Sequence, residues 1–170
     1  MSQVTRILVP TDFSAASDLA TDYAIDMAFR YGASIHFVYV FEDLYLAGFP
    51  DGYVDLSGVR KQQEEDAQTR LAVLLGKCAA ARLDVSTDIL TGHPAAMIVA
   101  EASTTGADII VMGTHGRTGF AHMFLGSVAE RVVRTAPCPV LTVRENARVQ
   151  AALAADAAAR LEPLQVAVAR

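Results

Sequence analysis

Three glycines and a serine in the second half of the chain are spaced as a phosphate-binding loop requires. They follow the pattern Gly113-x2-Gly116-x9-Gly126-Ser127. An apolar, strand-like run at 109–112 precedes them, and a helix-like run follows at 128–135. Glycine lets the backbone take positive φ and come close to a ligand, and N–H groups at a helix start attract anions. The pattern indicates a phosphate site, with a glycine-rich surface turn that binds nothing as the alternative.

The glycine pattern differs from two common nucleotide-binding fingerprints. No Gly-Lys-Ser/Thr follows at the distance that a P-loop needs. Gly113, Gly116 and Gly119 are three residues apart, which does not fit the G-x-G-x-x-G spacing of a Rossmann dinucleotide site. A phosphate loop at this place must therefore be of another kind.

Asp12 is the carboxylate best placed to act beside such a loop. It follows the first apolar run, 6–9, directly after Pro10 and Thr11. A carboxylate there can accept hydrogen bonds from ribose hydroxyls or hold a Mg²⁺ ion that bridges phosphates. The alternative is that Asp12 caps the following helix, which Ser14 can also do.

Three separated motifs in this order resemble the universal stress protein family. They are Val9-Pro10-Thr11-Asp12-Phe13-Ser14, the glycine pattern, and Cys138-Pro139-Val140-Leu141. The resemblance covers residues 1–145, and the glycine spacing followed by Ser or Thr marks the ATP-binding branch of that family. It implies that the chain binds ATP with Mg²⁺ and forms a homodimer through the last strand, 139–144.

The resemblance also assigns roles to particular residues around an adenine nucleotide. Pro10, Thr11 and Asp12 would line the end of the first strand, and Asp12 would hold Mg²⁺ through the phosphates. Val40 would present backbone groups to the adenine edge. Further along the chain, the nucleotide would contact Gly113, Gly116, Gly126, Ser127 and Val128. Of these, Gly113 would admit the ribose or α-phosphate, and the others would offer N–H groups or a hydroxyl; an ordinary helix cap is the alternative for Ser127.

Three titratable side chains fall inside the glycine loop. Arg117 is suited to clamp a γ-phosphate by charge, and His115 or His122 to shuttle a proton. Elsewhere the sequence suggests no nucleophile–base pair and no metal cluster. The pair Glu64-Glu65 is expected on a solvated helix face, and His36 is expected to be a satisfied structural histidine in a strand.

Composition narrows the class of protein. The 170 residues suit one domain with a core, since 52% are hydrophobic and 19% charged. The net charge of −5 argues against nucleic acid as a partner. No apolar run reaches the length of a membrane span, and the N-terminus does not read as a signal peptide, so we expect a cytoplasmic protein. Cys78 and Cys138 make no zinc motif and are expected to be small, buried or half-buried thiols.

Strand-like and helix-like segments alternate along the chain. Strands are expected at 6–9, 34–41, 84–90, 108–112 and 140–144, and helices at 14–31, 58–82, 95–104 and 127–135. This alternation predicts an α/β domain with a single open, five-stranded parallel sheet covered by helices on both faces, which is Rossmann-like. The resemblance implies the adenine nucleotide alpha hydrolase-like variety. The site residues follow strand ends, where open sheets of this kind bind ligands.

Two segments lie outside this alternation. Residues 42–59 mix aromatics with Gly and Pro and are expected to form a long loop, either a lid or dimer contact or a variable surface loop. Residues 146–170 are rich in alanine and are expected to form a helical C-terminal extension that packs on its own domain or on a partner.

The sequence thus favours an ATP-binding stress-response module with at most slow ATP hydrolysis. One alternative is a dimeric protein-interaction module that works without nucleotide, through an unknown protein partner. Another is an enzyme that acts on an adenylate-type substrate. Replacing Gly113 or Gly126 with valine is expected to abolish ATP binding without unfolding the domain.

Overall fold

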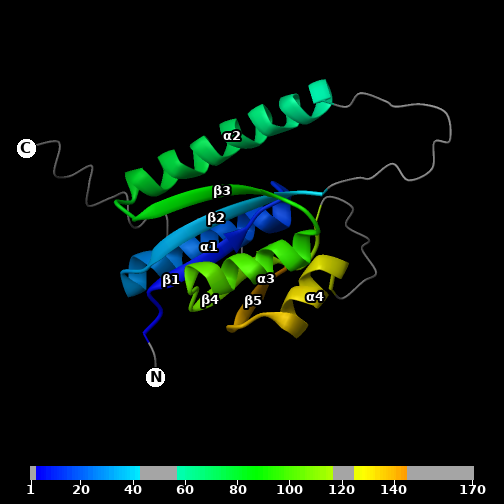
Figure 1. Ribbon diagram of the computed structural model, residues 1–170. Helices are drawn as coiled ribbons and strands as arrows, with labels where there is room; N and C mark the ends of the chain where they lie inside the picture. The colour runs from blue at the N-terminus through cyan, green and yellow to red at the C-terminus, as the bar shows by residue number, and fades with distance from the viewer. Residues whose placement is uncertain (1–2, 43–56, 117–124, 145–170) are drawn as a thin grey trace, which may run out of the picture.

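The computed structural model describes residues 3–42, 57–116 and 125–144 of the chain. The strands are β1 (Arg6–Pro10), β2 (Ser34–Phe41), β3 (Val85–Thr91), β4 (Ile109–Gly113) and β5 (Val140–Val143). The helices are α1 (Ala15–Tyr31), α2 (Ser57–Ala80), α3 (Pro94–Thr105) and α4 (Ser127–Thr135). Strands and helices therefore alternate throughout the described chain (Figure 1).

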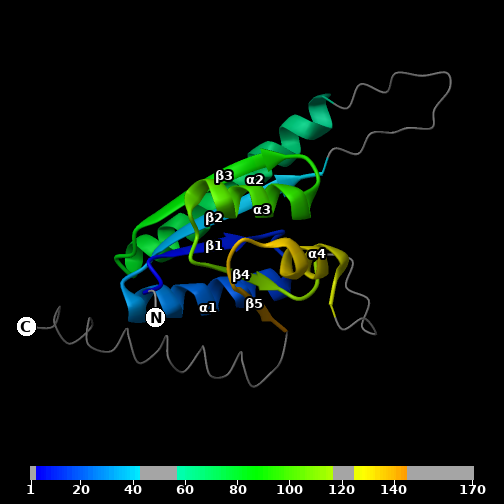
Figure 2. The same ribbon diagram turned by 60° about the horizontal axis from the view of Figure 1, so that its bottom comes forward.

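All five strands form one parallel sheet in the order β3-β2-β1-β4-β5. Helices α1 and α2 cover one face of the sheet, and α3 and α4 cover the other (Figures 1 and 2). Each face has its own core: Leu19 and Leu71 pack with Phe37 on the first face, and Ile98 and Val132 pack with Leu8 on the second. This arrangement confirms the predicted α/β fold with a five-stranded parallel sheet between helices.

The ends of the helices are set by local chemistry that the sequence shows. Ser14 caps α1, because its side chain accepts a hydrogen bond from the Ser17 N–H. Gly32 ends α1 in the left-handed conformation, with φ of 66°. Helix α2 was expected to run to Arg82 but ends at Ala80, because Arg82 takes a φ of 56° that no helix accommodates. The other element boundaries match the prediction or differ from it by one residue.

The two irregular segments of the sequence analysis fall largely outside the described residues. These are 43–56 of the expected loop 42–59, and the expected extension 146–170. The predicted division into a domain at 1–145 and an extension at 146–170 therefore stays a prediction. Among the described helices, none combines the length and apolar character needed to cross a membrane.

Candidate functional site

The site lies where the order of the strands reverses. From β1 the chain proceeds outward to β2 and β3, and it then returns to the other side of β1 with β4 and β5. The loops after β1 and β4 therefore leave the same edge of the sheet in opposite directions. Ligands of open parallel sheets bind in the crevice that such a reversal creates. Asp12 follows β1 and Gly116 follows β4, so the topology brings the two predicted motifs together.

The Asp12 carboxylate is fixed on one side and faces the glycine loop on the other. Its Oδ1 accepts hydrogen bonds from the Ser14 N–H at 3.1 Å and the Ser14 hydroxyl at 2.6 Å. Its Oδ2 lies 2.7 Å from the place that a Cβ on Gly116 would occupy. Ser14, not Asp12, supplies the cap of α1. Glycine at 116 thus leaves room for the carboxylate. Ser14 orients Asp12, and the Asp12 carboxylate does not cap the helix.

Phe13 holds the turn that carries Asp12. Its φ is 59°, in the left-handed region that residues with a Cβ rarely adopt. Its ring stacks on Tyr39 of β2 with centroids 5.1 Å apart, and the Arg70 guanidinium of α2 lies 5.4 Å from its centroid. Packing against α2 and β2 therefore stabilises an unfavourable backbone conformation directly beside Asp12.

In this loop, glycine is needed because other atoms come close to its Cα, and not because the backbone takes a positive φ. Neither Gly113 nor Gly116 has a positive φ. A Cβ on Gly113 would lie 2.8 Å from the backbone carbon of Ala16, so this glycine lets α1 pack against the end of β4. That Gly113→Val leaves the domain folded stays a prediction, but the close approach to the Ala16 backbone indicates that the change would also destabilise the domain, because backbone atoms cannot move aside as a side-chain tip can.

Helix α4 begins at Ser127, as expected, but its cap and the Gly126 N–H differ from the sequence expectation. Gly126 is the N-cap residue, and Ser127 is the first residue of the helix, so the alternative role of Ser127 as the cap is wrong. The Gly126 N–H was expected to meet a phosphate, but it donates to the Thr114 carbonyl at 2.7 Å. The N–H groups of Ser127 and Val128 remain in the first turn, where no earlier helical carbonyl can accept them.

The ends of β1 and β2 supply the remaining predicted residues. Pro10 ends β1 opposite Val38, and Thr11 is 6% exposed with its N–H donating to the Val38 carbonyl. Since the Val38 carbonyl points toward β1, strand alternation points the backbone groups of Val40 to the same side. β1 has already ended there, so Val40 presents backbone groups past the end of β1.

The loop residues with titratable side chains are only partly described. Arg117 and His122 lie outside the described residues. His115 is half-buried, and its Nδ1 lies 3.0 Å from the Thr114 hydroxyl.

The two cysteines lie outside the site. Cys78 is buried and Cys138 is half-buried, as expected, and burial raises the pKa of both thiols.

Sequence reasoning missed a second cluster, formed by His36 of β2, Asp88 of β3 and Glu101 of α3. His36 was expected to be a satisfied structural histidine. Its Nδ1 does meet the Ser86 hydroxyl at 2.8 Å, but its buried Nε2 has no hydrogen-bond partner. The expectation is therefore confirmed for Nδ1 and wrong for Nε2. The available signal was a histidine in an otherwise apolar strand, beside the polar alternation of Ser86 and Asp88.

Comparison with known proteins gives one family. The model of the universal stress protein family matches residues 3–144. The universal stress protein MJ0531 of Methanocaldococcus jannaschii is 37% identical over 142 residues, 82% of each chain. The universal stress protein Rv2005c of Mycobacterium tuberculosis is 32% identical over 144 residues, and the chain spans 47% of its length.

Solved structures agree with these sequence matches. The structure of the protein MJ0577 of M. jannaschii superposes with a TM-score of 0.76 at 26% identity, covering 85% of this chain and 99% of that one. A universal stress protein in complex with cAMP superposes with a TM-score of 0.63 at 25% identity, covering 84% of this chain and 98% of that one. Sequence, topology and the loops at the strand reversal agree: the chain belongs to the universal stress protein family.

Proposed function

We propose that this protein binds ATP, with Mg²⁺, at the strand reversal and acts as a stress-response regulatory module. The observation that carries the proposal is the placement of the Asp12 carboxylate against Gly116, between the ends of β1 and β4. Glycines on one side and an oriented carboxylate on the other suit a phosphate chain with its cation. That a relative of this fold binds cAMP supports an adenine nucleotide as the ligand.

Each part of the site has a role in this proposal. The Val40 backbone groups, past the end of β1, would meet the adenine edge. The N–H groups of Ser127 and Val128 would hold phosphate oxygens, because the N-terminus of α4 favours negative charge. Asp12 would accept from the ribose or hold Mg²⁺ at the phosphates. Arg117, outside the described residues, completes the proposal as a charge clamp.

Catalysis is a lesser part of the proposal. Enzymatic phosphoryl transfer depends on positioning and on charge. Among the described residues around the loop, Asp12 and His115 are the titratable groups near the glycines, and His115 contacts Thr114. We therefore infer hydrolysis that is slow at most. Both cysteines are free thiols, which suits the reducing cytoplasm where we place the protein.

The test is a calorimetric titration of the full chain with ATP and Mg²⁺, repeated with GTP. We expect one site per chain and micromolar affinity, about −8 kcal/mol, with selectivity for ATP. Asp12→Ala should weaken binding by about 10- to 100-fold, as loss of a charged hydrogen-bonding group does. Asp84→Ala is the matched control, because Asp84 is exposed and precedes β3 at the opposite end of the sheet.

Two outcomes would support the rival functions. Nucleotide-free protein that gives no heat with either nucleotide would favour an interaction module that works without nucleotide. Rapid turnover of an adenylate-type co-substrate would favour an enzyme.

A further inference from the structure

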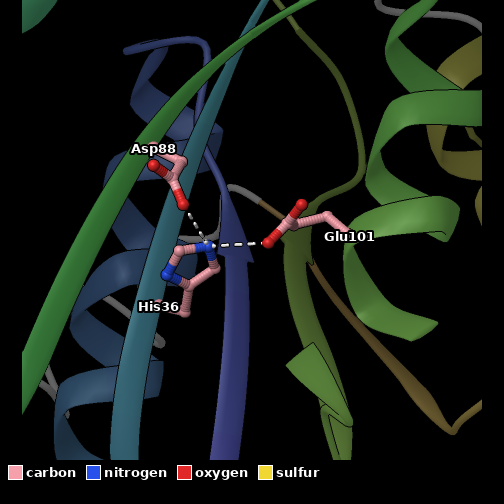
Figure 3. A group of neighbouring side chains, drawn as sticks. All are labelled: His36, Asp88 and Glu101. Atoms are coloured by element: carbon pink, nitrogen blue, oxygen red, sulfur yellow. Dashed lines mark ion pairs between the residues drawn. The ribbon is translucent and has the colours of Figure 1, made fainter. Parts of the chain in front are cut away.

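The cluster of His36, Asp88 and Glu101 lies away from the nucleotide site. His36 precedes Val40 by four residues on β2, about 13 Å along a strand. Its side chain points to the face covered by α3, where Glu101 lies, and Asp88 approaches from the neighbouring strand β3 (Figure 3). Three elements that are distant in the sequence thus converge on one imidazole nitrogen.

We propose that these three side chains form a binding site for a divalent transition-metal ion, Zn²⁺ foremost. Imidazole and carboxylate are both zinc ligands, and zinc sites with three protein ligands take water in the fourth position. The His36 and Glu101 side chains are 14% and 15% exposed, and Asp88 is 59% exposed. One side of the cluster is therefore buried, and the other is open to water.

The distances agree with ligands around one ion. Nε2 of His36 lies 3.2 Å from Glu101 Oε1 and 3.5 Å from Asp88 Oδ2. Two ligands of a tetrahedral zinc ion, each about 2.0–2.2 Å from it, are about 3.4 Å apart. All three ligand atoms lie within 4.8 Å of one another. Asp88 is the exposed member of the cluster and is the side chain that would move to bring the two carboxylates to that spacing.

The missing hydrogen bond on Nε2 is explained by the same geometry. A carboxylate oxygen 3.2 Å away would normally accept from an Nε2–H, yet neither oxygen lies in line to do so. In a tetrahedral site, each oxygen lies about 35° off the axis from the nitrogen to the metal, which leaves it beyond reach of that proton. The same offset is expected if an ion on the axis of the Nε2 lone pair were held by both oxygens.

Ser86 would act as a positioning residue for the metal ligand. Its hydroxyl lies 2.8 Å from His36 Nδ1, and the two residues are register partners on adjacent strands. An Nδ1–H that donates to Ser86 leaves Nε2 without a proton, as a metal ligand requires. Charge favours the ion as well, because a cation between the two carboxylates offsets their mutual repulsion.

The test is a calorimetric titration of chelator-treated, nucleotide-free full-length protein with ZnCl₂. We expect one Zn²⁺ per chain. His36→Gln and Glu101→Gln should each weaken binding by more than about 100-fold, and Ser86→Ala by about 10- to 100-fold, as for residues that orient a ligand. Glu64→Gln is the matched control, an exposed glutamate on α2, and should bind as the unmodified chain does.

Spectroscopy and a second ion give independent readouts. Co²⁺ in place of Zn²⁺ should give the intense visible absorption of a four-coordinate site, and Glu101→Gln should lose it with an unchanged circular dichroism spectrum. Mg²⁺ should bind far more weakly, because it prefers oxygen ligands and retains its water. The proposal is overturned if Zn²⁺ gives no saturable binding, if Glu101→Gln binds as tightly as Glu64→Gln, or if Mg²⁺ binds as tightly as Zn²⁺.

Discussion

Contacts of single atoms separate a glycine of the loop that the packing requires from one that lies beside the proposed ligand site. A Cβ on Gly113 would meet the backbone of α1 at Ala16, whereas a Cβ on Gly116 would meet only the tip of the Asp12 side chain. The sequence pattern treats the two positions alike, yet the structure gives them different neighbours. The cost of changing each residue should therefore appear in different measurements.

Gly113→Ala should lower the free energy of unfolding by about 1–3 kcal/mol, because the added methyl group forces α1 away from the end of β4. Gly116→Ala should leave that free energy nearly unchanged but should weaken ATP binding, because the methyl group displaces the Asp12 carboxylate. Urea unfolding and nucleotide titration of both variants check this separation. Gly76→Ala, at an exposed position in α2 with nothing within 4 Å of a Cβ, is the control for the binding measurement and should leave ATP affinity unchanged. Equal unfolding free energies for the two loop variants would contradict the assignment.

At the scale of elements, the start of α1 couples helix stability to the site. The Ser14 hydroxyl accepts from the Ser17 N–H and donates to Asp12 Oδ1. One side chain thus ends the β1–α1 loop as a cap and also orients the carboxylate that the proposed function needs.

Ser14→Ala should cost about 1 kcal/mol of stability, as loss of an N-cap does. It should also weaken binding of ATP with Mg²⁺, because Asp12 loses a fixed orientation. Ser14→Thr, which keeps a hydroxyl, should recover most of both. Thermal unfolding and calorimetry on the three proteins test this, and a stability loss with unchanged nucleotide affinity would show that Asp12 needs no support from Ser14.

The order of strands and helices could largely be predicted from the sequence. The meeting of side chains from distant elements, as in the His36 cluster, could not. Period-two and period-four patterns, with Ser14 and Gly32 as helix boundaries, identify the strands and helices because backbone hydrogen bonding and burial act locally. The switch-point site followed from motifs placed directly after strands. The His36 cluster could not be found in this way, because residues 36, 88 and 101 meet only through the parallel register of β2 with β3 and the packing of α3. The Gly126 N–H was misassigned because its partner, the Thr114 carbonyl, is a backbone group that the sequence does not mark.

At the scale of the whole molecule, β5 is the edge strand through which we propose that the chain forms a homodimer. It is the last strand in the sheet order and pairs with β4 on one side. The carbonyls of Pro139 and Val143 accept hydrogen bonds from the β4 side. By strand alternation, the N–H of Thr142 points away from β4, toward the edge.

Thr142→Pro should therefore reduce dimer formation without removing a bond between β4 and β5, because proline takes a donor from the outer edge alone. Thr142→Val, which keeps the N–H, is the control. Light scattering across a range of concentrations gives the readout. A dimer that persists unchanged in Thr142→Pro would place the contact elsewhere.

The Asp108 carboxylate joins the amino ends of β1 and β4 by hydrogen bonds. Asp108, before β4, accepts hydrogen bonds from the Thr5 N–H at 2.7 Å, the Thr5 hydroxyl at 2.8 Å and the Arg6 N–H at 2.9 Å. These bonds lower the pKa of Asp108 below its ordinary value, the Thr5 backbone bond most of all. The carboxylate thus links the two central strands at the end opposite the proposed site.

Stability from this link should be lost in acid. A carboxyl with a lowered folded pKa stabilises the fold above the unfolded pKa of about 3.9, and that contribution disappears as pH falls through the folded value. The stability difference between the unmodified chain and Asp108→Ala should therefore be largest above about pH 4. It should shrink as the solution is acidified further. Denaturant unfolding at a series of pH values gives the result, and Thr5→Val should show a smaller form of the same effect. A difference that does not change with pH would refute the link.

The strained turn at Phe13 has an optical consequence. Its ring lies on Tyr39 under Arg70, on the α2 face of the sheet, while its neighbour Asp12 faces the proposed nucleotide site. The chain contains no tryptophan, so a Phe13→Trp variant would carry a single indole at this place. Any shift of the turn when a nucleotide binds should change the emission of that indole, which would report from the face of the sheet that α1 and α2 cover.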